Sequence, residues 1–201
     1  VKGKTKVTPL RPPELYLDNF PFPVRSPLRN FALDRRFATL IAGRGCVNNC
    51  SFCNNTEYIK QSLAPFRRIR KPEMVVEEID FLHQKKDCSV FLFEDDDFPV
   101  RTNDGSGWID RFCKALKRKK LINKIIWKIN CRPDEIDFDS FKLMKTHGLF
   151  LTFLGIDDGT DYGLARLNKH MKLEDSMRGI SILKELEIGF DYGFMLFQPA
   201  S

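Results

Sequence analysis

The sequence predicts an α/β fold with a parallel sheet, and two patterns carry this prediction. Short apolar runs of the β type alternate with amphipathic segments of helical period along most of the 201 residues, as in βα units joined by right-handed crossovers. Polar residues cluster directly after several of these runs, where parallel sheets place their ligands. The chain is 42% hydrophobic, enough for one core, and no apolar run approaches the ~20 residues of a membrane span, so no membrane partner is expected.

Each expected element has its own signal in the chain. The first helix begins with Pro72 and repeats apolar residues at helical spacing, and the third is ended by Gly148, a frequent C-terminal cap. The strands are short apolar runs of the β type. The expected strands are residues 37–42, 89–93, 125–131, 149–156 and 190–197. The expected helices are residues 72–85, 108–119, 139–147 and 174–186.

The chain divides into two sections. Residues 1–36 hold six of the eleven prolines, which exclude long helices and central strands, so a proline-rich linker or N-terminal extension is expected there. Residues 37–201 form the expected core. Residues 1–8 show no apolar export signal, and six cysteines are too few for a disulfide scaffold. A cytoplasmic protein in a reducing interior is therefore expected.

Three cysteines, Cys46, Cys50 and Cys53, form a C-x3-C-x2-C cluster after the first strand. Three thiolates at this spacing can close on one face of an iron-sulfur cluster, which needs four ligands, so one position stays open for a substrate or cofactor. A zinc site completed by one of the three histidines of the chain is the alternative, although none of them is close in sequence. The remaining cysteines, Cys88, Cys113 and Cys131, are expected to be buried core thiols.

Further polar residues follow the other strands. Residues 94–97 are four consecutive acids after the second strand, Asn130, Arg132 and Asp134 follow the third, and residues 155–160 follow the fourth. The carboxyl ends of parallel strands meet at one rim, so these groups are expected near the cysteines. Adjacent carboxylates repel one another unless cations or hydrogen-bond donors compensate, which favours a ligand site over a packing role.

The cysteine loop, C-x3-C-x-aromatic-C after an apolar strand, resembles the signature of radical S-adenosylmethionine (radical SAM) enzymes. The resemblance implies that Cys46, Cys50 and Cys53 ligate a 4Fe-4S cluster, that S-adenosylmethionine binds its fourth iron, and that Phe52 lies against the adenine. It also implies a partial (β/α) barrel. The family's core has six strands and only five can be counted here, so the chain resembles a fragment truncated after the fifth strand.

Two strand ends resemble a subfamily that carries a cobalamin-binding domain. Asp95 and Asp96 match its Asp-Asp-x-Phe segment, which implies contact with the amino group of S-adenosylmethionine. Asp157 and Asp158 stand where the related Gly-Ile-Glu-Ser-Gly-Ser motif has Glu and Ser, and the resemblance implies that the acid binds the ribose hydroxyls, although aspartate is one methylene shorter. Cobalamin is accordingly a possible cofactor of a full-length parent.

The third strand end resembles the family's Asn-x-Arg-x-Asp segment. Asn130 and Arg132 are therefore candidates for contact with cofactor or substrate, with a structural ion pair of Arg132 as the alternative. The implied function is reductive cleavage of S-adenosylmethionine to start radical chemistry on an unknown substrate, with an electron donor such as flavodoxin or ferredoxin. The alternative is a non-catalytic zinc module whose basic face, including residues 117–120, binds nucleic acid. Residues 117–120 can also be a solvated end of a helix, with no binding role.

Overall fold

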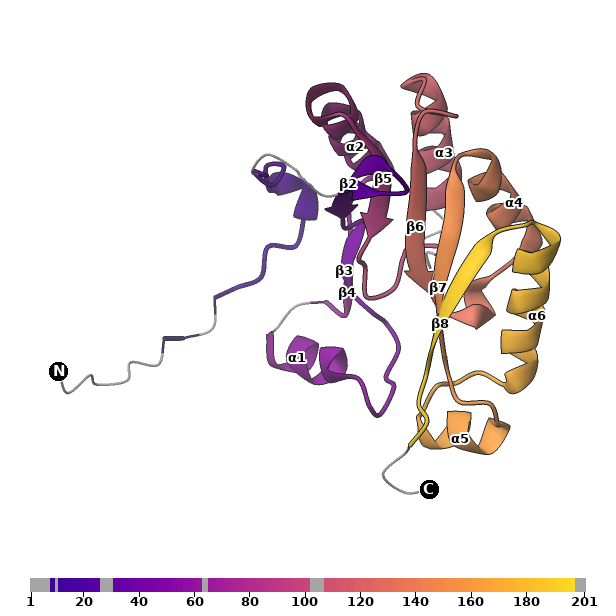
Figure 1. Ribbon diagram of the computed structural model, residues 1–201. Helices are drawn as coiled ribbons and strands as arrows, with labels where there is room; N and C mark the ends of the chain where they lie inside the picture. Colours follow the sequence, from indigo (N-terminus) through magenta and orange to yellow (C-terminus); the bar gives the residue numbers. More distant parts are fainter. Residues whose placement is uncertain (1–7, 10, 26–30, 63–64, 102–106, 198–201) are drawn as a thin grey trace.

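The sheet has six strands in the order β1-β2-β5-β6-β7-β8. The computed structural model describes residues 8–9, 11–25, 31–62, 65–101 and 107–197 (Figure 1). β1 pairs antiparallel with β2, and every other neighbouring pair is parallel, so the predicted α/β fold with a parallel sheet is confirmed. The strands are β1 (Phe31–Ala32), β2 (Arg35–Leu40), β5 (Cys88–Phe93), β6 (Ile126–Cys131), β7 (Leu149–Asp157) and β8 (Gly189–Phe194).

Four helices connect the parallel strands and pack on one side of the sheet (Figure 1). They are α2 (Pro72–Lys86), α3 (Trp108–Arg118), α4 (Phe138–Thr146) and α6 (Leu173–Glu185). All five parallel strands and all four helices were expected, within a few residues at their ends. β2 begins at Arg35, so the sheet starts inside the segment that the sequence predicted as linker.

Several short elements were not expected from the sequence. They are β1, α1 (Asn54–Ser62), α5 (Asp161–Arg166), the antiparallel pair β3 (Gly43–Gly45) and β4 (Arg67–Ile69), and the 3-10 turns η1 (Leu17–Asn19) and η2 (Pro133–Glu135). The pair β3–β4 carries the chain into the cysteine loop. A Cβ atom on Gly43 would lie 2.9 Å from the carbonyl oxygen of Arg68, so only glycine allows the two backbones to approach this closely.

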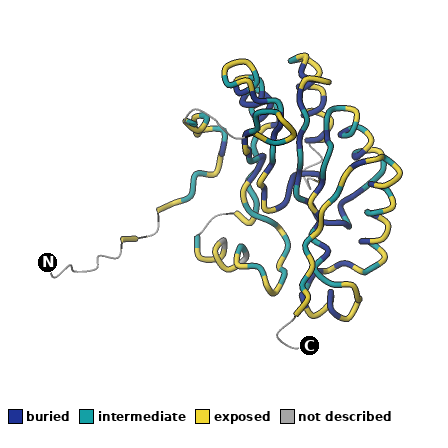
Figure 2. The backbone as a smooth tube through the Cα atoms, viewed as in Figure 1, coloured by how far each residue is buried: buried dark blue, intermediate teal, exposed yellow. Residues whose placement is uncertain are grey.

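Aromatic side chains fill the core between the sheet and its helices. Phe112 is fully buried, and its ring centroid lies 5.1 Å from that of Trp108, 5.3 Å from that of Trp127 and 6.0 Å from that of Phe93. Edge-to-face and stacked contacts of this kind add to the free energy of burying large apolar surfaces. Figure 2 shows the buried stretches concentrated here, whereas α1 is largely exposed.

The segment before the sheet is held by ion pairs. Glu78 of α2 is buried, and its carboxylate binds Arg25 at 2.8 Å and Arg70 at 2.7 Å. Asp18 accepts a hydrogen bond from the backbone N–H of Lys71 at 2.9 Å. Residues 17–25 therefore lie against the start of α2. Residues 1–7, in which the sequence shows no export signal, lie outside the described residues.

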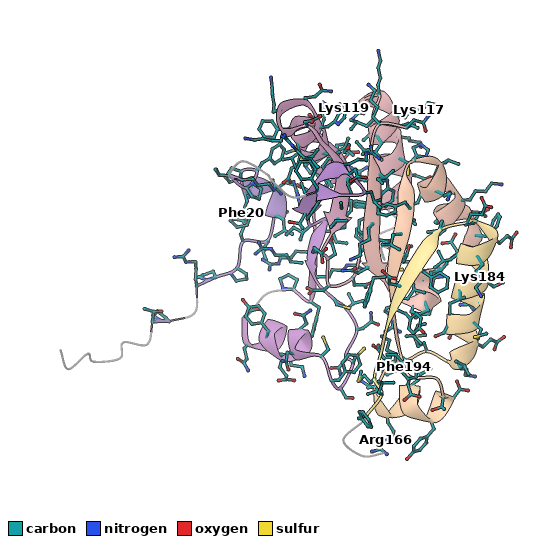
Figure 3. All side chains as sticks on the ribbon, viewed as in Figure 1. Phe20, Lys117, Lys119, Arg166, Lys184 and Phe194 are labelled. Carbon is teal, nitrogen blue, oxygen red and sulfur yellow. The ribbon has the colours of Figure 1, made fainter. Side chains whose placement is uncertain are left out.

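The basic run of residues 117–120 lies at the end of α3. Figure 3 shows Lys117 and Lys119 at the opposite end of the molecule from Arg166 and Phe194. Lys119 forms ion pairs with Glu77 at 2.7 Å and Asp80 at 3.1 Å, as expected for a solvated helix end. In the part of the chain that the structure describes, no helix is long and apolar enough to cross a membrane.

Candidate functional site

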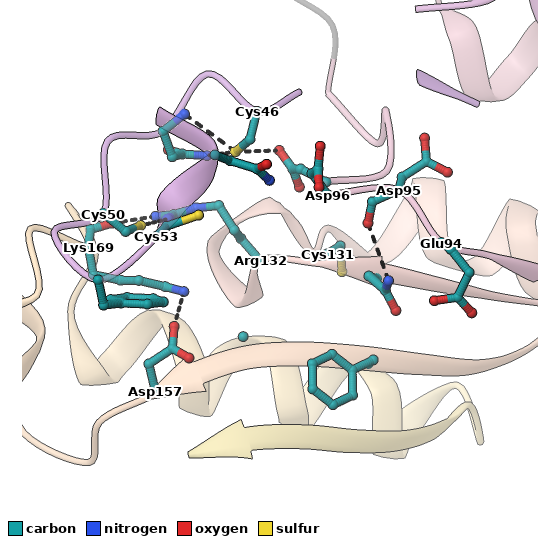
Figure 4. Close-up of a pocket in the computed structure, with 17 residues that line it drawn as sticks. Cys46, Cys50, Cys53, Glu94, Asp95, Asp96, Cys131, Arg132, Asp157 and Lys169 are labelled. Atoms are coloured by element: carbon teal, nitrogen blue, oxygen red, sulfur yellow. Dashed lines mark hydrogen bonds and ion pairs between the residues drawn. The ribbon is translucent and has the colours of Figure 1, made fainter. Parts of the chain in front are cut away.

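A cavity of about 420 Å³ lies at the carboxyl ends of the parallel strands (Figure 4). Nine of the ten site residues expected from the sequence line it, and Asp158 does not. The nine are Cys46, Cys50, Phe52, Cys53, Asp95, Asp96, Asn130, Arg132 and Asp157. The lining also includes Asn48, Asp97, Phe153 and Lys169, which were not among the expected site residues. The topology therefore brings together loops that are more than 100 residues apart in sequence.

The three cysteines are free thiols of intermediate exposure. Cys46 Sγ accepts hydrogen bonds from the backbone N–H of Asn48 at 3.4 Å and from its Nδ2 at 3.3 Å, and Arg132 Nη1 donates to Cys50 Sγ at 3.9 Å. Burial raises the pKa of both thiols, while Lys169 and Arg132 act to lower the pKa of Cys50. Such donors stabilise negative charge on sulfur, which suits thiolates that ligate an iron-sulfur cluster.

The described side chains do not form a site for a single metal ion. Among the described residues, no three or more histidine, cysteine, aspartate or glutamate side chains come close enough together to hold one. Neither the three cysteines nor the histidines expected for the zinc alternative form such a group. By their chemistry, three free thiols on one loop, two of them with N–H donors, suit the ligand set of an iron-sulfur cluster.

Two acids of the run after β5 accept hydrogen bonds from backbone N–H groups of residues 42–45, just before Cys46. Asp95 is buried, and its carboxylate accepts hydrogen bonds from the N–H groups of Ala42 at 3.0 Å and Gly43 at 2.6 Å. Burial raises the pKa of Asp95 to about 7, against the effect of these two hydrogen bonds. Asp96 is exposed and accepts from the N–H of Gly45 at 2.9 Å. Of the two acids expected at the amino group of the cofactor, Asp96 is thus the more accessible.

A buried carboxyl pair, Asp97 and Glu135, lies beside Cys46. Asp97 is 3.7 Å from Cys46 Sγ and forms an ion pair with Arg67 at 3.7 Å. Burial raises the pKa of Glu135 to about 8, and the negative charge of Asp97 adds to this effect. Glu135 does not line the cavity but contacts Asp97, which does, and sequence reasoning missed this contact because it depends on the tertiary fold. Asp97 belonged to the acidic run, but nothing in the sequence marked it as buried.

Asp157 lies at the end of β7 and forms a short ion pair with Lys169. Lys169 is buried, and its ammonium lies 5.8 Å from the centroid of the Phe52 ring, within cation–π range. The carboxylate of Asp158 instead accepts from the N–H and hydroxyl of Thr160, both at 2.8 Å. The structure therefore places Asp158 at the start of α5 and outside the cavity, because consecutive residues at a strand end point in different directions.

Asn130 and Arg132 connect the strand ends to one another. Asn130 Nδ2 donates to the carbonyl oxygen of Asp95 at 3.2 Å. Arg132 binds Asp134 through Nε at 2.9 Å and Nη2 at 3.1 Å. The structural ion pair that the sequence left open for Arg132 is therefore present, together with the contact to Cys50. Cys131 also lines the cavity, whereas Cys88 and Cys113 are buried away from it, and all three are buried as expected.

Residues 40–198 match the model of the Radical SAM superfamily. The chain is 28% identical over 155 residues to an anaerobic magnesium-protoporphyrin IX monomethyl ester cyclase of Rubrivivax gelatinosus, covering 76% of the chain and 26% of that protein. It is 26% identical over 188 residues to an "uncharacterized methyltransferase" of Pyrococcus horikoshii, covering 91% of the chain and 38% of that protein. The chain thus spans between about a quarter and two fifths of the length of these relatives.

Solved structures with the same fold include two enzymes that use cobalamin. The cobalamin-dependent S-adenosylmethionine radical enzyme OxsB matches 79% of this chain and 24% of its own, with a TM-score of 0.68 and 19% identity. The radical S-adenosylmethionine methyltransferase TsrM from Kitasatospora setae matches 80% of this chain and 31% of its own, with a TM-score of 0.66 and 15% identity. These likenesses confirm the predicted partial barrel.

Proposed function

The chain belongs to the radical SAM superfamily, and we propose that it binds a 4Fe-4S cluster through Cys46, Cys50 and Cys53 and uses it to cleave S-adenosylmethionine reductively. The observation that supports this proposal is the cavity at the strand ends, because the three thiols share it with acidic, amide and cationic side chains from three further strand ends. The alternative, a zinc module with a nucleic-acid-binding face, gains no support from the family match or from the paired Lys119.

A 4Fe-4S cluster held by Cys46, Cys50 and Cys53 would supply the electron for reductive cleavage of a carbon–sulfur bond of S-adenosylmethionine, and would so start radical chemistry on the substrate. The chain's own residues position and shield these groups. We propose that Asp96, and to a lesser degree the buried Asp95, faces the amino group. Phe52, which is partly exposed, offers its ring to the adenine.

Asp157 is the proposed partner of the ribose hydroxyls. Lys169 donates to its Oδ2, and no residue in the described part of the chain donates to its Oδ1. A carboxylate accepts several hydrogen bonds, so Asp157 keeps capacity for a ligand. Asn130 and Arg132 are proposed to contact cofactor or substrate from β6. Asp158 has no proposed contact, because its carboxylate binds Thr160.

The reaction that follows cleavage is proposed at the level of the family. Relatives named as a cyclase and as methyltransferases, and the structural likeness to cobalamin-dependent enzymes, favour a methyl transfer or another cobalamin-assisted reaction in a longer parent protein. An electron donor such as flavodoxin or ferredoxin is the proposed partner. We also propose a cytoplasmic location, because the cluster and its thiol ligands need reducing surroundings.

Reconstitution with iron and sulfide under anaerobic conditions tests the cluster. We expect about four irons per chain and charge-transfer absorbance in the visible range. Cys46→Ala, Cys50→Ala and Cys53→Ala should each abolish that absorbance, whereas the buried Cys88→Ala and Cys113→Ala serve as matched controls that retain it. Stoichiometric zinc with no uptake of iron would contradict the proposal.

Titration calorimetry of the reconstituted protein tests the ribose contact. Asp157→Ala should weaken binding of S-adenosylmethionine by about 1.5 to 3 kcal/mol, the range for hydrogen bonds to a charged group. Asp139→Ala is the control, because Asp139 is an exposed acid on α4, on the helical side of the sheet. Equal affinities of Asp157→Ala and the wild type would rule out the ribose role.

A further inference from the structure

The cysteine loop is tied to a turn that lies more than 100 residues further along the chain. The backbone N–H of Ser51 donates to the carbonyl oxygen of Leu167 at 2.9 Å, and the Ser51 hydroxyl donates to that of Arg166 at 3.2 Å. Asn168 Nδ2 donates to the carbonyl oxygen of Asn49 at 2.6 Å. These three hydrogen bonds flank Cys50 on both sides. They join the loop after β3 to the turn that follows α5.

Few contacts within the cysteine loop fix its conformation. Its two large apolar side chains, Val47 and Phe52, are 54% and 44% exposed, so burial of apolar surface contributes little to holding it. Hydrogen bonds within the loop include those from Asn48 to Cys46 Sγ and the one from the N–H of Cys53 to the carbonyl oxygen of Cys50 at 3.1 Å. Contacts from outside the loop therefore set the position of Cys50, and besides the three hydrogen bonds to the turn they include the donation from Arg132 Nη1 to Cys50 Sγ at 3.9 Å.

The turn after α5 is fixed by hydrogen bonds at both ends of that helix. Thr160 caps α5 by accepting from the N–H of Gly163 at 3.0 Å. The N–H of Lys169 donates to the carbonyl oxygen of Leu164 at 3.0 Å and closes the C-terminal end of the helix. Asn168 has φ +51°, in the left-handed region that asparagine tolerates better than most residues. Its side chain is thereby directed at the cysteine loop.

The turn is also joined to the sheet. Arg132 Nη2 donates to the carbonyl oxygen of Lys169 at 2.6 Å, and the same guanidinium is oriented by Asp134. Lys169 reaches back to Asp157 at the end of β7 through their ion pair. The turn is thus fixed to β6 and β7 on one side and holds the cysteine loop on the other.

We propose that residues 166–169 act as a clamp that positions the cysteine loop for cluster binding, with Asn168 as a positioning residue; this inference rests on the proposed function. The clamp makes the geometry of the thiols depend on the ends of β6 and β7, where the proposed partners of S-adenosylmethionine lie. It differs from a ligand role, because neither Asn168 nor Leu167 lines the cavity.

Two substitutions test the clamp without straining the backbone. Asn168→Gly removes the amide and keeps a residue that adopts positive φ freely, and Asn168→Asp replaces the amide by an isosteric carboxylate that repels the Asn49 carbonyl oxygen. Asn123 provides the matched control, because it is an exposed asparagine with φ +62° in the turn before β6, far from the cavity. Asn123→Gly and Asn123→Asp carry the same chemical changes there.

Hydrogen–deuterium exchange of the metal-free protein is the first measurement. In Asn168→Gly we expect exchange across residues 46–53 to rise about threefold to tenfold, the factor that corresponds to one hydrogen bond. The Asn123→Gly control should leave it unchanged. Release of the reconstituted cluster to a chelator should accelerate by a similar factor in Asn168→Gly, and the electron paramagnetic resonance signal of the reduced cluster should change, while the unfolding midpoint of the metal-free protein matches that of the control.

The outcomes are separable. Equal exchange in Asn168→Gly and Asn123→Gly overturns the clamp. Faster exchange with unchanged cluster release and an unchanged resonance signal overturns the positioning role, because the contact would then be structural only. A wild-type protein that takes up no iron overturns the proposed function, and the exchange comparison on metal-free protein then decides by itself whether the turn holds the loop.

Discussion

The two ends of the βα units are held together by different forces. On the helical side of the sheet, fully buried aromatic rings such as Phe93, Phe112 and Trp127 pack against one another. At the carboxyl ends of the strands, the chain is held by hydrogen bonds and ion pairs around a cavity. The aromatic core therefore stabilises the fold. The polar side chains at the strand ends surround a cavity, and burying their charges lowers the stability of the fold. Substitutions in the two regions should separate these roles.

The largest expected effect is in the aromatic core. Phe112→Ala removes a ring that touches three other aromatic side chains, and the cavity left behind should lower the free energy of unfolding by about 3 to 5 kcal/mol. Phe197→Ala, at a phenylalanine that is 89% exposed, should change it by less than about 0.5 kcal/mol. Denaturant unfolding of the metal-free proteins measures both. Similar losses in the two variants would contradict the contrast between core and surface.

The largest expected effect at the rim comes from the Lys169–Asp157 pair. Lys169→Met removes the one ion-pair partner that the described residues give the largely buried carboxylate of Asp157, so the free energy of unfolding should fall by about 3 kcal/mol. The double variant Lys169→Met/Asp157→Asn removes the stranded charge as well and should recover at least half of that loss. A double variant as unstable as Lys169→Met alone would show that the pair matters through packing and not through charge.

The third prediction concerns pH. The pKa of Glu135 is raised to about 8 from an ordinary value of 4.5, so the folded state holds a proton that the unfolded state releases, and stability falls as pH rises through this window. Between pH 5 and pH 7 the loss should be about 2 kcal/mol. Glu135→Gln should flatten this dependence, although Asp95, whose pKa is also raised, keeps part of it. A variant with the wild-type pH profile would contradict the assignment.

The smallest expected effect is on the cluster itself. Asn48→Ala removes the Nδ2 donor to Cys46 Sγ but keeps the backbone N–H donor. Loss of one hydrogen bond of about 1 kcal/mol to a ligand sulfur should lower the one-electron midpoint potential of the reconstituted cluster by about 40 mV. The control is Asn55→Ala, which removes an amide on α1 that also lines the cavity. A potential that rises, or that shifts equally in both variants, would refute the role of this donor.

The sequence predicted the core region better than the rim. Strands such as β5 and helices such as α2 follow from the period of their apolar residues, because burial against the sheet imposes that period. β3 and β4 are three residues each and carry glycine and arginine, so only their pairing with one another makes them strands. α1 is largely polar and α5 has only six residues, so neither sequence carries an apolar stripe long enough to predict a helix.

The candidate site shows the same division. The positions of the cysteines and of Asp157 at strand ends followed from the topology of parallel sheets. The burial of Asp95 and the partners of Lys169 did not, because each depends on contacts with residues at least 12 positions away. Asp158 was expected beside Asp157 in the cavity, but its place in the cap of α5 depends on Thr160. Hydrogen-bond partners of this kind have no period in the sequence.

The clamp has a consequence for folding. The hydrogen bonds that join the cysteine loop to its turn span 115 and 119 residues, so we expect them to form late, after the intervening strands have come together. Until then the three thiols lie on an unanchored loop, open to oxidation and to adventitious metals. Cluster insertion should therefore follow chain folding, and cells that express this protein should need to keep its thiols reduced between release from the ribosome and delivery of iron.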